Sequence, residues 1–269
     1  SGRIDSPYWA MQALLADSSL VAMDKAMKLE QLNLQRREIT QAIQEEAETK
    51  VDHSQPLLMA SHPEWPSGIV GLIAGRLQEK YGKPSFIMEE RGDFVVGSAR
   101  SLPGFHCVEA IQSSADLLEN FGGHKQAAGF RLKKENLESF IQSMQDYARD
   151  YFEKQPLVLQ LDVDLHLKDS DLTLESIDRL SGFAPHGIGN PVPLFIMKDV
   201  TVMSSRPVGA TGDHLKFTIQ FGDAIIDGIG FRFGKQEEEF EKATEVVVQL
   251  DINEWNGIRK PQVKLVDFH

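Results

Sequence analysis

The sequence has little cysteine, no long apolar run and no excess of basic charge. Cys107 is the single cysteine in 269 residues, so the chain cannot form an internal disulfide or a thiolate zinc cluster. No window approaches the roughly eighteen consecutive apolar residues of a membrane-spanning helix. The first residues also lack the basic start and apolar core of a signal peptide. These absences favour a protein of the reducing cytoplasm that has no membrane partner.

Basic charge is scarce throughout, and the formal net charge is −12. Residues 156–269 alone hold 18 acidic and 11 basic side chains. Nonspecific nucleic-acid binders usually carry an excess of basic residues, so the composition argues against that class. An acidic protein with a local basic groove is nevertheless compatible with this composition. The sequence begins at Ser1 rather than at a methionine. We therefore expect the natural protein to be longer.

The N-terminal fifth of the chain predicts one long helix, from Ser18 to Val51. Ser18 or Ser19 can cap its start, and neither Gly nor Pro interrupts it. About thirty residues at 1.5 Å each form a rod of roughly 45–50 Å, a length suited to connecting two domains. The apolar positions recur at helical spacing: Leu20, Met23, Met27, Leu32, Ile39 and Ile43.

Residues 56–155 alternate between short apolar strands and amphipathic helices, which predicts an α/β domain. Strands are expected near 57–60, 84–88, 94–98 and 128–132, and helices near 68–81 and 135–152. A further helix is expected to carry Val108, Ile111, Ala115 and Leu118 on one face.

Residues 156–269 predict an all-β domain of five or six short strands with one short helix near 174–180. The strands are expected at 157–165, 195–204, 214–221, 224–231, 244–253 and 262–266. This pattern fits a small barrel of the oligonucleotide/oligosaccharide-binding (OB) type, with a β-sandwich as the competing architecture.

Two glycine-bearing segments of the α/β domain carry candidate chemistry. The first is "GSARSLPGF", where Ser98, Arg100 and Ser101 lie at the end of a predicted strand. Hydroxyl donors beside a guanidinium fork suit phosphate oxygens, although a surface arginine at a strand end is the simpler interpretation of this motif alone.

The second segment is "FGGHKQAAGF", which we expect to be a loop leading into a strand. Gly122 and Gly123 can expose backbone N–H groups to an anion, and His124 can donate to a phosphate or assist a leaving oxygen. A histidine beside small residues is also often a satisfied core side chain, so this segment alone does not decide the function.

Four motifs in a fixed order resemble the RecJ-type single-strand-specific exonucleases of the DHH phosphoesterase superfamily. They are "SHPEWPSGIVGLIAGRL", the Ser98-containing segment, the Gly-Gly-His segment and "FAPHGIGNPVPLF". "SGRIDSP" at the start is similar to the close of the family's DHH domain. This chain departs from the family pattern at Pro66, where many members carry a histidine.

The resemblance implies four regions. Residues 1–17 would end the DHH catalytic domain, 18–55 would be the connector helix, 56–155 the DHH-associated substrate-binding domain, and 156–269 the OB-type barrel. In a manganese- or magnesium-dependent 5′-3′ exonuclease of DNA repair and recombination, Ser98, Arg100 and Ser101 would hold the terminal phosphate. Gly122, Gly123 and the auxiliary catalytic His124 would face the scissile phosphate, and Arg3 would reach substrate at the domain seam.

The resemblance also places the metal ligands before Ser1, so we expect this chain to bind single-stranded DNA without cutting it. The barrel would follow the strand through Arg206, Lys216, Phe231 and Arg232. A single-strand-binding protein or a helicase is the expected protein partner, and a monomer the expected state. The alternatives are a DHH-family phosphodiesterase for short oligonucleotides or cyclic dinucleotides, and a non-catalytic replication scaffold.

Overall fold

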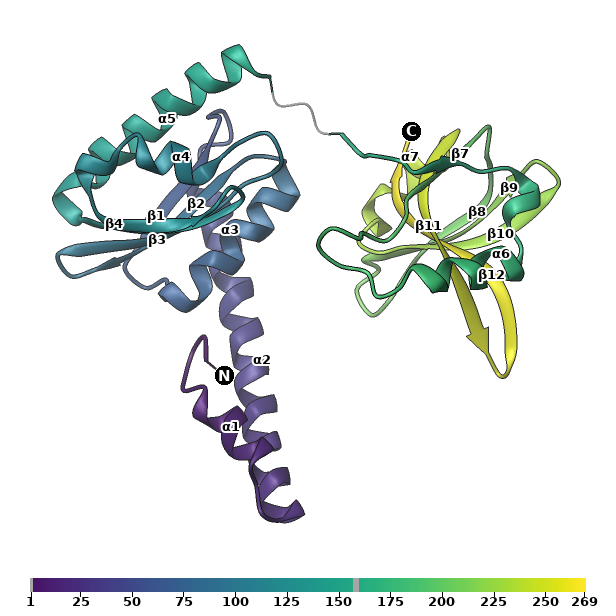
Figure 1. Cartoon of the computed structure of the whole chain (residues 1–269), viewed down its shortest axis with the longest axis horizontal. Coiled ribbons are helices and arrows are strands. Elements are labelled where there is room, and N and C mark those ends of the chain that lie inside the picture. The colour runs from purple at the N-terminus through teal and green to yellow at the C-terminus, as the bar shows by residue number, and fades with distance from the viewer. Residues whose placement is uncertain (1, 157–159) are drawn as a thin grey trace. The chain divides into compact units, whose positions relative to one another are not determined.

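The computed structural model describes residues 2–156 and 160–269, and the chain divides into two compact units, Ser1–Leu159 and Gln160–His269 (Figure 1). The first unit combines helices with a five-stranded sheet, and the second is built around a seven-stranded sheet. The predicted combination of a long helix, an α/β domain and an OB-type domain is confirmed.

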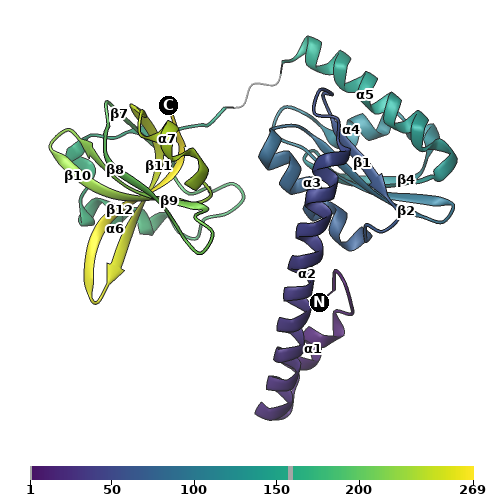
Figure 2. The ribbon, with the colours of Figure 1, turned by 180° about the vertical axis from the view of Figure 1, so that it is seen from behind.

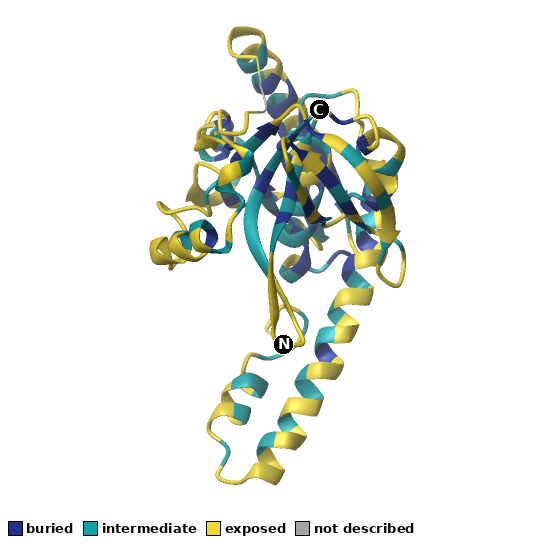
Figure 3. Ribbon diagram, turned by 90° about the vertical axis from the view of Figure 1, so that its right-hand side faces the viewer, coloured by how far each residue is buried: buried dark blue, intermediate teal, exposed yellow. Residues whose placement is uncertain are grey.

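The long helix α2 spans Ser19–Lys50, and Ser18 caps it by accepting a hydrogen bond from the Val21 N–H at 3.4 Å. Its second half is anchored in the first unit, where Ile43 and Ala47 are buried. Its first half extends beyond the sheet beside α1 (Tyr8–Leu14), as Figures 2 and 3 show. The apolar side chains of that half remain exposed, at 83% for Leu20, 64% for Met23 and 62% for Met27. The helix prediction is confirmed, but this part of its apolar stripe has no cover in the described structure.

The sheet of the first unit has the order β1-β2-β3-β5-β4, with β1 and β2 parallel and the other pairs antiparallel. Helices α4 and α5 cover one face, and α3 with the end of α2 covers part of the other, so that α3 and α5 lie on opposite sides (Figure 1). The elements are β1 (Leu58–His62), α3 (Ser67–Tyr81), β2 (Ser85–Arg91), β3 (Phe94–Arg100), α4 (Cys107–Gln112), β4 (Leu118–His124), β5 (Ala127–Lys133) and α5 (Leu137–Lys154).

The helix expected to extend from Val108 to Leu118 is shorter than predicted. Helix α4 ends at Gln112, a single 3₁₀ turn follows at Ala115–Leu117, and Leu118 already belongs to β4. The Ser113 hydroxyl donates to the Ala110 carbonyl at 2.7 Å, a local bond that competes with continuation of the helix.

The segment expected to be a glycine loop is instead the edge strand β4. It pairs with β5 as an antiparallel hairpin whose turn is Lys125 and Gln126. Six of its seven residues are exposed, so the strand shows no alternation of buried and exposed side chains. The hydrogen bonds of β5, rather than the local pattern, make this segment a strand.

The second unit forms one sheet in the order β6-β7-β11-β12-β10-β9-β8, with a single core built mainly from side chains of the strands. Because the strands form one continuous sheet, the structure supports the OB-type prediction rather than a β-sandwich of two stacked sheets. The elements are β6 (Leu165–His166), α6 (Leu174–Leu180), β7 (Phe195–Lys198), β8 (Thr201–Val208), β9 (His214–Phe221), β10 (Ala224–Gly230), α7 (Glu237–Phe240), β11 (Glu245–Trp255) and β12 (Ile258–Phe268).

Two strand predictions in this unit were wrong. The strand expected at 157–165 is reduced to β6, because residues 160–164 have no regular structure and 157–159 lie outside the described residues. The strand expected at 195–204 is two strands, β7 and β8, separated at Asp199, whose positive φ of 57° breaks the extended conformation.

Candidate nucleic-acid interface

The register of β3, β5 and β4 brings the two candidate motifs onto one face of the sheet. Ser98 pairs with Gly129, which pairs with Gly122, and Arg100 pairs with Ala127, which pairs with His124. Directly paired residues of antiparallel strands project to the same side. The two segments, more than twenty residues apart in the sequence, therefore lie on one face in two parallel rows, with β5 between them. Neighbouring rows lie about 6.7 Å apart, two residues along a strand.

Helix α3 forms a wall beside these rows, and two of its glycines make room for Arg100. A Cβ at Gly71 would lie 3.1 Å from both Arg100 Nη2 and Ser98 Oγ, and one at Gly75 would lie 3.9 Å from Arg100 Cγ. The glycines therefore leave space for the guanidinium beside α3, and its Nη1 donates to the Ala99 carbonyl at 2.8 Å. The sequence showed these glycines within a family motif, but their role depends on a helix crossing a strand and could not be predicted from spacing.

Arg3 lies at the start of the same helix. Its Nη1 donates to the Gly68 carbonyl at 3.1 Å, and a Cβ at Gly68 would stand 2.9 Å from the Arg3 carbonyl carbon. Gly68 thus permits a close approach of two backbones. The predicted seam residue Arg3 and two of the three predicted phosphate-binding residues, Ser98 and Arg100, thus lie beside the same helix, α3.

The glycines of β4 and β5 divide into two kinds. Gly123 has φ +148°, and a Cβ there would meet the Ala127 carbonyl oxygen and stand 2.6 Å from Ala128 Cα, so the fold itself requires glycine. A Cβ at Gly122 would have no atom within 4 Å, and a Cβ at Gly129 would have only the Gly97 carbonyl oxygen, at 3.8 Å. Gly122 and Gly129 therefore form a floor without side chains, which we name the glycine shelf.

Ser101 is occupied within the protein. It is 6% exposed, its hydroxyl donates to the Phe105 carbonyl at 2.9 Å, and its N–H donates to the Gln126 carbonyl at 2.9 Å. The second bond ties the loop after β3 to the turn of the β4–β5 hairpin. Ser101 thus holds the two motifs together, whereas Ser98 and Arg100 are only partly buried.

His124 ends β4 with an exposed side chain, and the backbone beside it is fixed by Cys107. The Cys107 N–H donates to the Lys125 carbonyl at 2.9 Å, and its thiol to the His124 carbonyl at 3.5 Å. Burial raises the pKa of the Cys107 thiol to about 11. Cys107 is accordingly a packing residue rather than a nucleophile.

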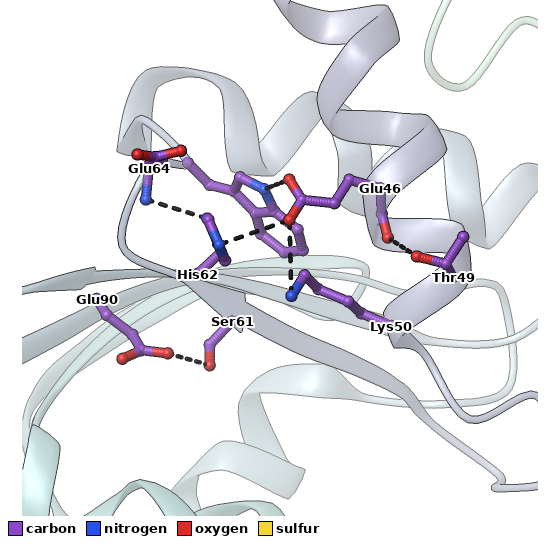
Figure 4. A network of polar contacts seen from close by, with 8 residues as sticks. Glu46, Thr49, Lys50, Ser61, His62, Glu64 and Glu90 are labelled. Carbon is purple, nitrogen blue, oxygen red and sulfur yellow. Dashed lines mark hydrogen bonds and ion pairs between the residues drawn. The ribbon is translucent and has the colours of Figure 1, made fainter.

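A polar network joins α2 to the loop that precedes α3 (Figure 4). The Trp65 indole N–H donates to Glu46 Oε2 at 2.8 Å, and His62 Nε2 lies 3.5 Å from Glu46 Oε1. The bond from Trp65 is the largest cause that lowers the pKa of Glu46, with smaller contributions from His62 and Lys50. The network orients Trp65, and Pro66 follows as the residue that precedes helix α3.

In the second unit, the predicted strand-tracking residues lie on exposed parts of the barrel. Arg206 and Lys216 are a directly paired row of β8 and β9, both exposed. Phe231 is 54% exposed and packs edge-on against His214 with ring centroids 5.3 Å apart. The Arg232 N–H donates to His214 Nδ1 at 3.2 Å.

Sequence reasoning missed the tip of the β11–β12 hairpin. Trp255 is 74% exposed and Ile258 is 62% exposed, and they pair directly across a turn in which Asn256 and Gly257 have positive φ. The Asn-Gly pair between two apolar residues is a hairpin signal that could have located this tip.

The donor set for a catalytic metal centre is not found in residues 2–156 and 160–269. No three His, Cys, Asp or Glu side chains in that part of the chain are grouped closely enough to hold an ion. Bridging two metal ions requires several such ligands, so the described residues do not fit a two-metal centre. None of the helices described is both long and apolar enough to span a lipid bilayer.

Comparison with known families covers both units. Residues 54–150 match the DHHA1 domain family, and residues 163–267 match the RecJ OB domain family. Among curated proteins, the chain is 30% identical to the single-stranded-DNA-specific exonuclease RecJ of Bacillus subtilis, over 99% of this chain and 35% of that protein. It is 31% identical to RecJ of Escherichia coli, over 98% of this chain and 48% of that protein.

A solved structure gives the same result. The crystal structure of RecJ from Thermus thermophilus in complex with Mn²⁺ superposes with a TM-score of 0.82 at 27% identity, covering all of this chain and 39% of that one. The chain thus spans less than half the length of both of these curated relatives.

Proposed function

The chain is a RecJ-family region that carries a DHHA1 domain and a RecJ OB domain, and from this premise we propose that it is the substrate-binding half of a single-stranded-DNA-specific 5′-3′ exonuclease of DNA repair and recombination. In this proposal residues 1–17 end the catalytic domain and 18–55 connect it to the substrate-binding domain at 56–155. Residues 156–269 form the OB-type domain.

The proposal rests on one observation: a guanidinium, a hydroxyl and an imidazole lie on the same sheet face as the glycine shelf, which has no side chains. Ser98 and Arg100 project from β3 beside Gly71, and Gly122 and His124 lie in the same two rows. A guanidinium and a hydroxyl suit a phosphate. The glycine shelf admits a sugar-phosphate backbone close to the sheet.

Each side chain then has a distinct task. Arg100 and Ser98 bind the 5′-terminal phosphate, and Ser101 supports them by pinning their loop to the hairpin turn. Gly122 lets the next linkage approach, while Gly123 shapes the strand that presents His124. His124 donates a hydrogen bond to the scissile phosphate as an auxiliary group. Arg3, whose Nη1 donates to the Gly68 carbonyl at the start of α3, is proposed to reach the same ligand.

Hydrolysis itself is assigned to groups outside this chain. Mn²⁺ or Mg²⁺ supplies a metal-activated water and charge neutralisation in such reactions, and the described residues offer no site for it. The proposal therefore has this chain bind and orient the strand without cutting it. Release of nucleotides from single-stranded DNA by this 269-residue chain in the presence of Mn²⁺ would contradict this assignment.

The OB-type domain is proposed to follow the strand further from its end, through Arg206, Lys216, Phe231 and Arg232. Basic and aromatic side chains are the usual means of sequence-tolerant single-strand binding. We further propose that the protein is a cytoplasmic monomer and that it binds a single-strand-binding protein or a helicase.

The test is a fluorescence-anisotropy titration of the chain with a single-stranded octanucleotide, with and without a 5′ phosphate, over a salt series. We expect tighter binding of the phosphorylated end, lost in Arg100→Ala, because the salt-sensitive contact and the end contact are the same guanidinium. Arg149→Ala removes an arginine from α5, on the opposite side of the sheet, and is the matched control. Binding that ignores both the phosphate and Arg100 would overturn the proposal.

A further inference from the structure

The open sheet face continues beyond the glycine shelf to a further arginine. Arg131 of β5 pairs with Val96 of β3 and with Asn120 of β4, so it lies one row past Ser98, Gly129 and Gly122. Alternation places it on the same face as Arg100. From the Arg100 row to the Arg131 row is four residues along β5, or about 13 Å.

Arg131 is held in a defined orientation by an aromatic ring. Its guanidinium carbon lies 3.9 Å from the centroid of the Phe94 ring, a cation–π contact. Its Nε is buried and has no hydrogen-bond partner among the described residues. Stacking occupies the flat side of the guanidinium and leaves the in-plane N–H groups of its two terminal Nη atoms as donors. The Arg131 side chain is therefore held in position while it still has hydrogen-bond donors to offer to a ligand.

The neighbours of Arg131 on this face suit a nucleic-acid backbone. Asn120 is an exposed amide on the edge strand, and Lys133 is exposed one row further along β5. Lys133 meets Glu135 at 3.6 Å, a solvent-exposed pair of little strength. Glu89, on the same face beneath the start of α3, accepts the Ser67 N–H at 2.9 Å. Glu89, an acidic residue of this same row, is thus engaged by the helix terminus.

We propose that Arg131 binds an internal phosphate of the single strand, with Asn120 beside it, so that the strand runs along β5 from Arg100 and His124 toward Lys133. The inference rests on the proposed function and gives it a direction and a second backbone contact. A stacked strand rises about 3.4 Å per nucleotide, so the 13 Å separation corresponds to about four nucleotides, and to fewer in an extended strand. A dinucleotide engages the first contact without reaching the second.

The experiment compares Arg131→Gln with Arg149→Gln by anisotropy, using a 5′-phosphorylated dinucleotide and octanucleotide. Arg149 is a matched exposed arginine on α5 that pairs with Asp146 at 2.6 Å. We expect Arg131→Gln to weaken octanucleotide binding about tenfold and to lower the slope of log K against log salt by about 0.7. Dinucleotide binding stays unchanged. Arg131→Lys keeps the charge, so the salt slope is retained.

A phosphate scan separates direct contact from a structural effect. One neutral methylphosphonate linkage is moved along the octanucleotide, and its cost is measured in the wild-type chain and in Arg131→Gln. Direct contact predicts one internal linkage whose neutralisation costs affinity in the wild type and nothing in the variant. Equal costs at every linkage in both proteins would overturn the inference, as would unchanged octanucleotide affinity in Arg131→Gln. Failure of the proposed function has a different signature, the loss of all dependence on the 5′ phosphate and Arg100.

Discussion

Two adjacent glycines in β4 should respond oppositely to the same substitution. In Gly123→Ala the new Cβ would stand 2.6 Å from Ala128 Cα, about 1 Å inside ordinary contact, and would also meet the Ala127 carbonyl oxygen. These are backbone atoms that cannot rotate away. Overpacking of this kind costs about 1–3 kcal/mol, and a non-glycine residue at φ +148° adds a similar amount. The expected destabilisation is about 2–6 kcal/mol.

Gly122→Ala meets no atom within 4 Å. Alanine restricts the unfolded chain more than glycine does, so this variant should be as stable as the wild type or more stable by about 0.4–1 kcal/mol. The same methyl group stands on the glycine shelf, where we place the nucleic-acid backbone. Gly122→Ala should therefore weaken binding of a 5′-phosphorylated octanucleotide while the fold stays intact.

The two variants are compared by thermal unfolding, monitored by the fluorescence of buried Trp65. Trp9 and Trp255 are first replaced by phenylalanine so that Trp65 is the fluorescent tryptophan. Trp65 is 1% exposed and belongs to the first unit, so its signal reports the unit that contains β4. We expect Gly123→Ala to lower the midpoint on the order of 10 °C. Equal midpoints for the two variants, or an earlier transition in Gly122→Ala, would refute the reasoning.

Two further predictions concern groups outside the sheet face. Because burial raises the pKa of Cys107 to about 11, the thiol should react with a disulfide reagent at pH 8 only as fast as the chain opens, and rapid labelling of the native chain would contradict this. Trp65→Phe removes the donor that lowers the pKa of Glu46, so an NMR carboxyl titration should show that pKa rising toward its ordinary 4.5, and an unchanged value would rule out the hydrogen bond. Since the folded chain lowers this pKa, the stabilisation from Glu46 is complete above pH 4.5 and is lost as the pH falls through the lowered value.

The sequence was sufficient for elements whose own pattern is strong. Helix α2 follows from an uninterrupted apolar series and from the Ser18 cap, and β9 from alternation between His214 and Phe221. Strand β4 could not be predicted, because an exposed edge strand with adjacent glycines has no pattern of its own and depends on the hydrogen bonds of β5.

The candidate site was predictable in its residue types but not in its division of labour. Arg100, Ser98 and His124 were identified from their chemistry and from the family resemblance, and the register brings them to one face. Ser101 has the same chemistry as Ser98, yet its hydroxyl points to the Phe105 carbonyl. The roles of Gly71 and Arg131 follow from a helix crossing and a strand pairing, which are long-range contacts that no local pattern encodes.

The most direct test of the account is a map of backbone amide shifts in the ¹⁵N-labelled chain on addition of a 5′-phosphorylated octanucleotide. The account predicts that shifts in the first unit concentrate in β3, β4 and β5, at Ser98, Arg100, Gly122, His124, Gly129 and Arg131. Helix α5, on the other side of the sheet, should be unaffected. Shifts confined to the second unit, or in the first unit centred on α5, would contradict the claim that the open face of this sheet binds the strand.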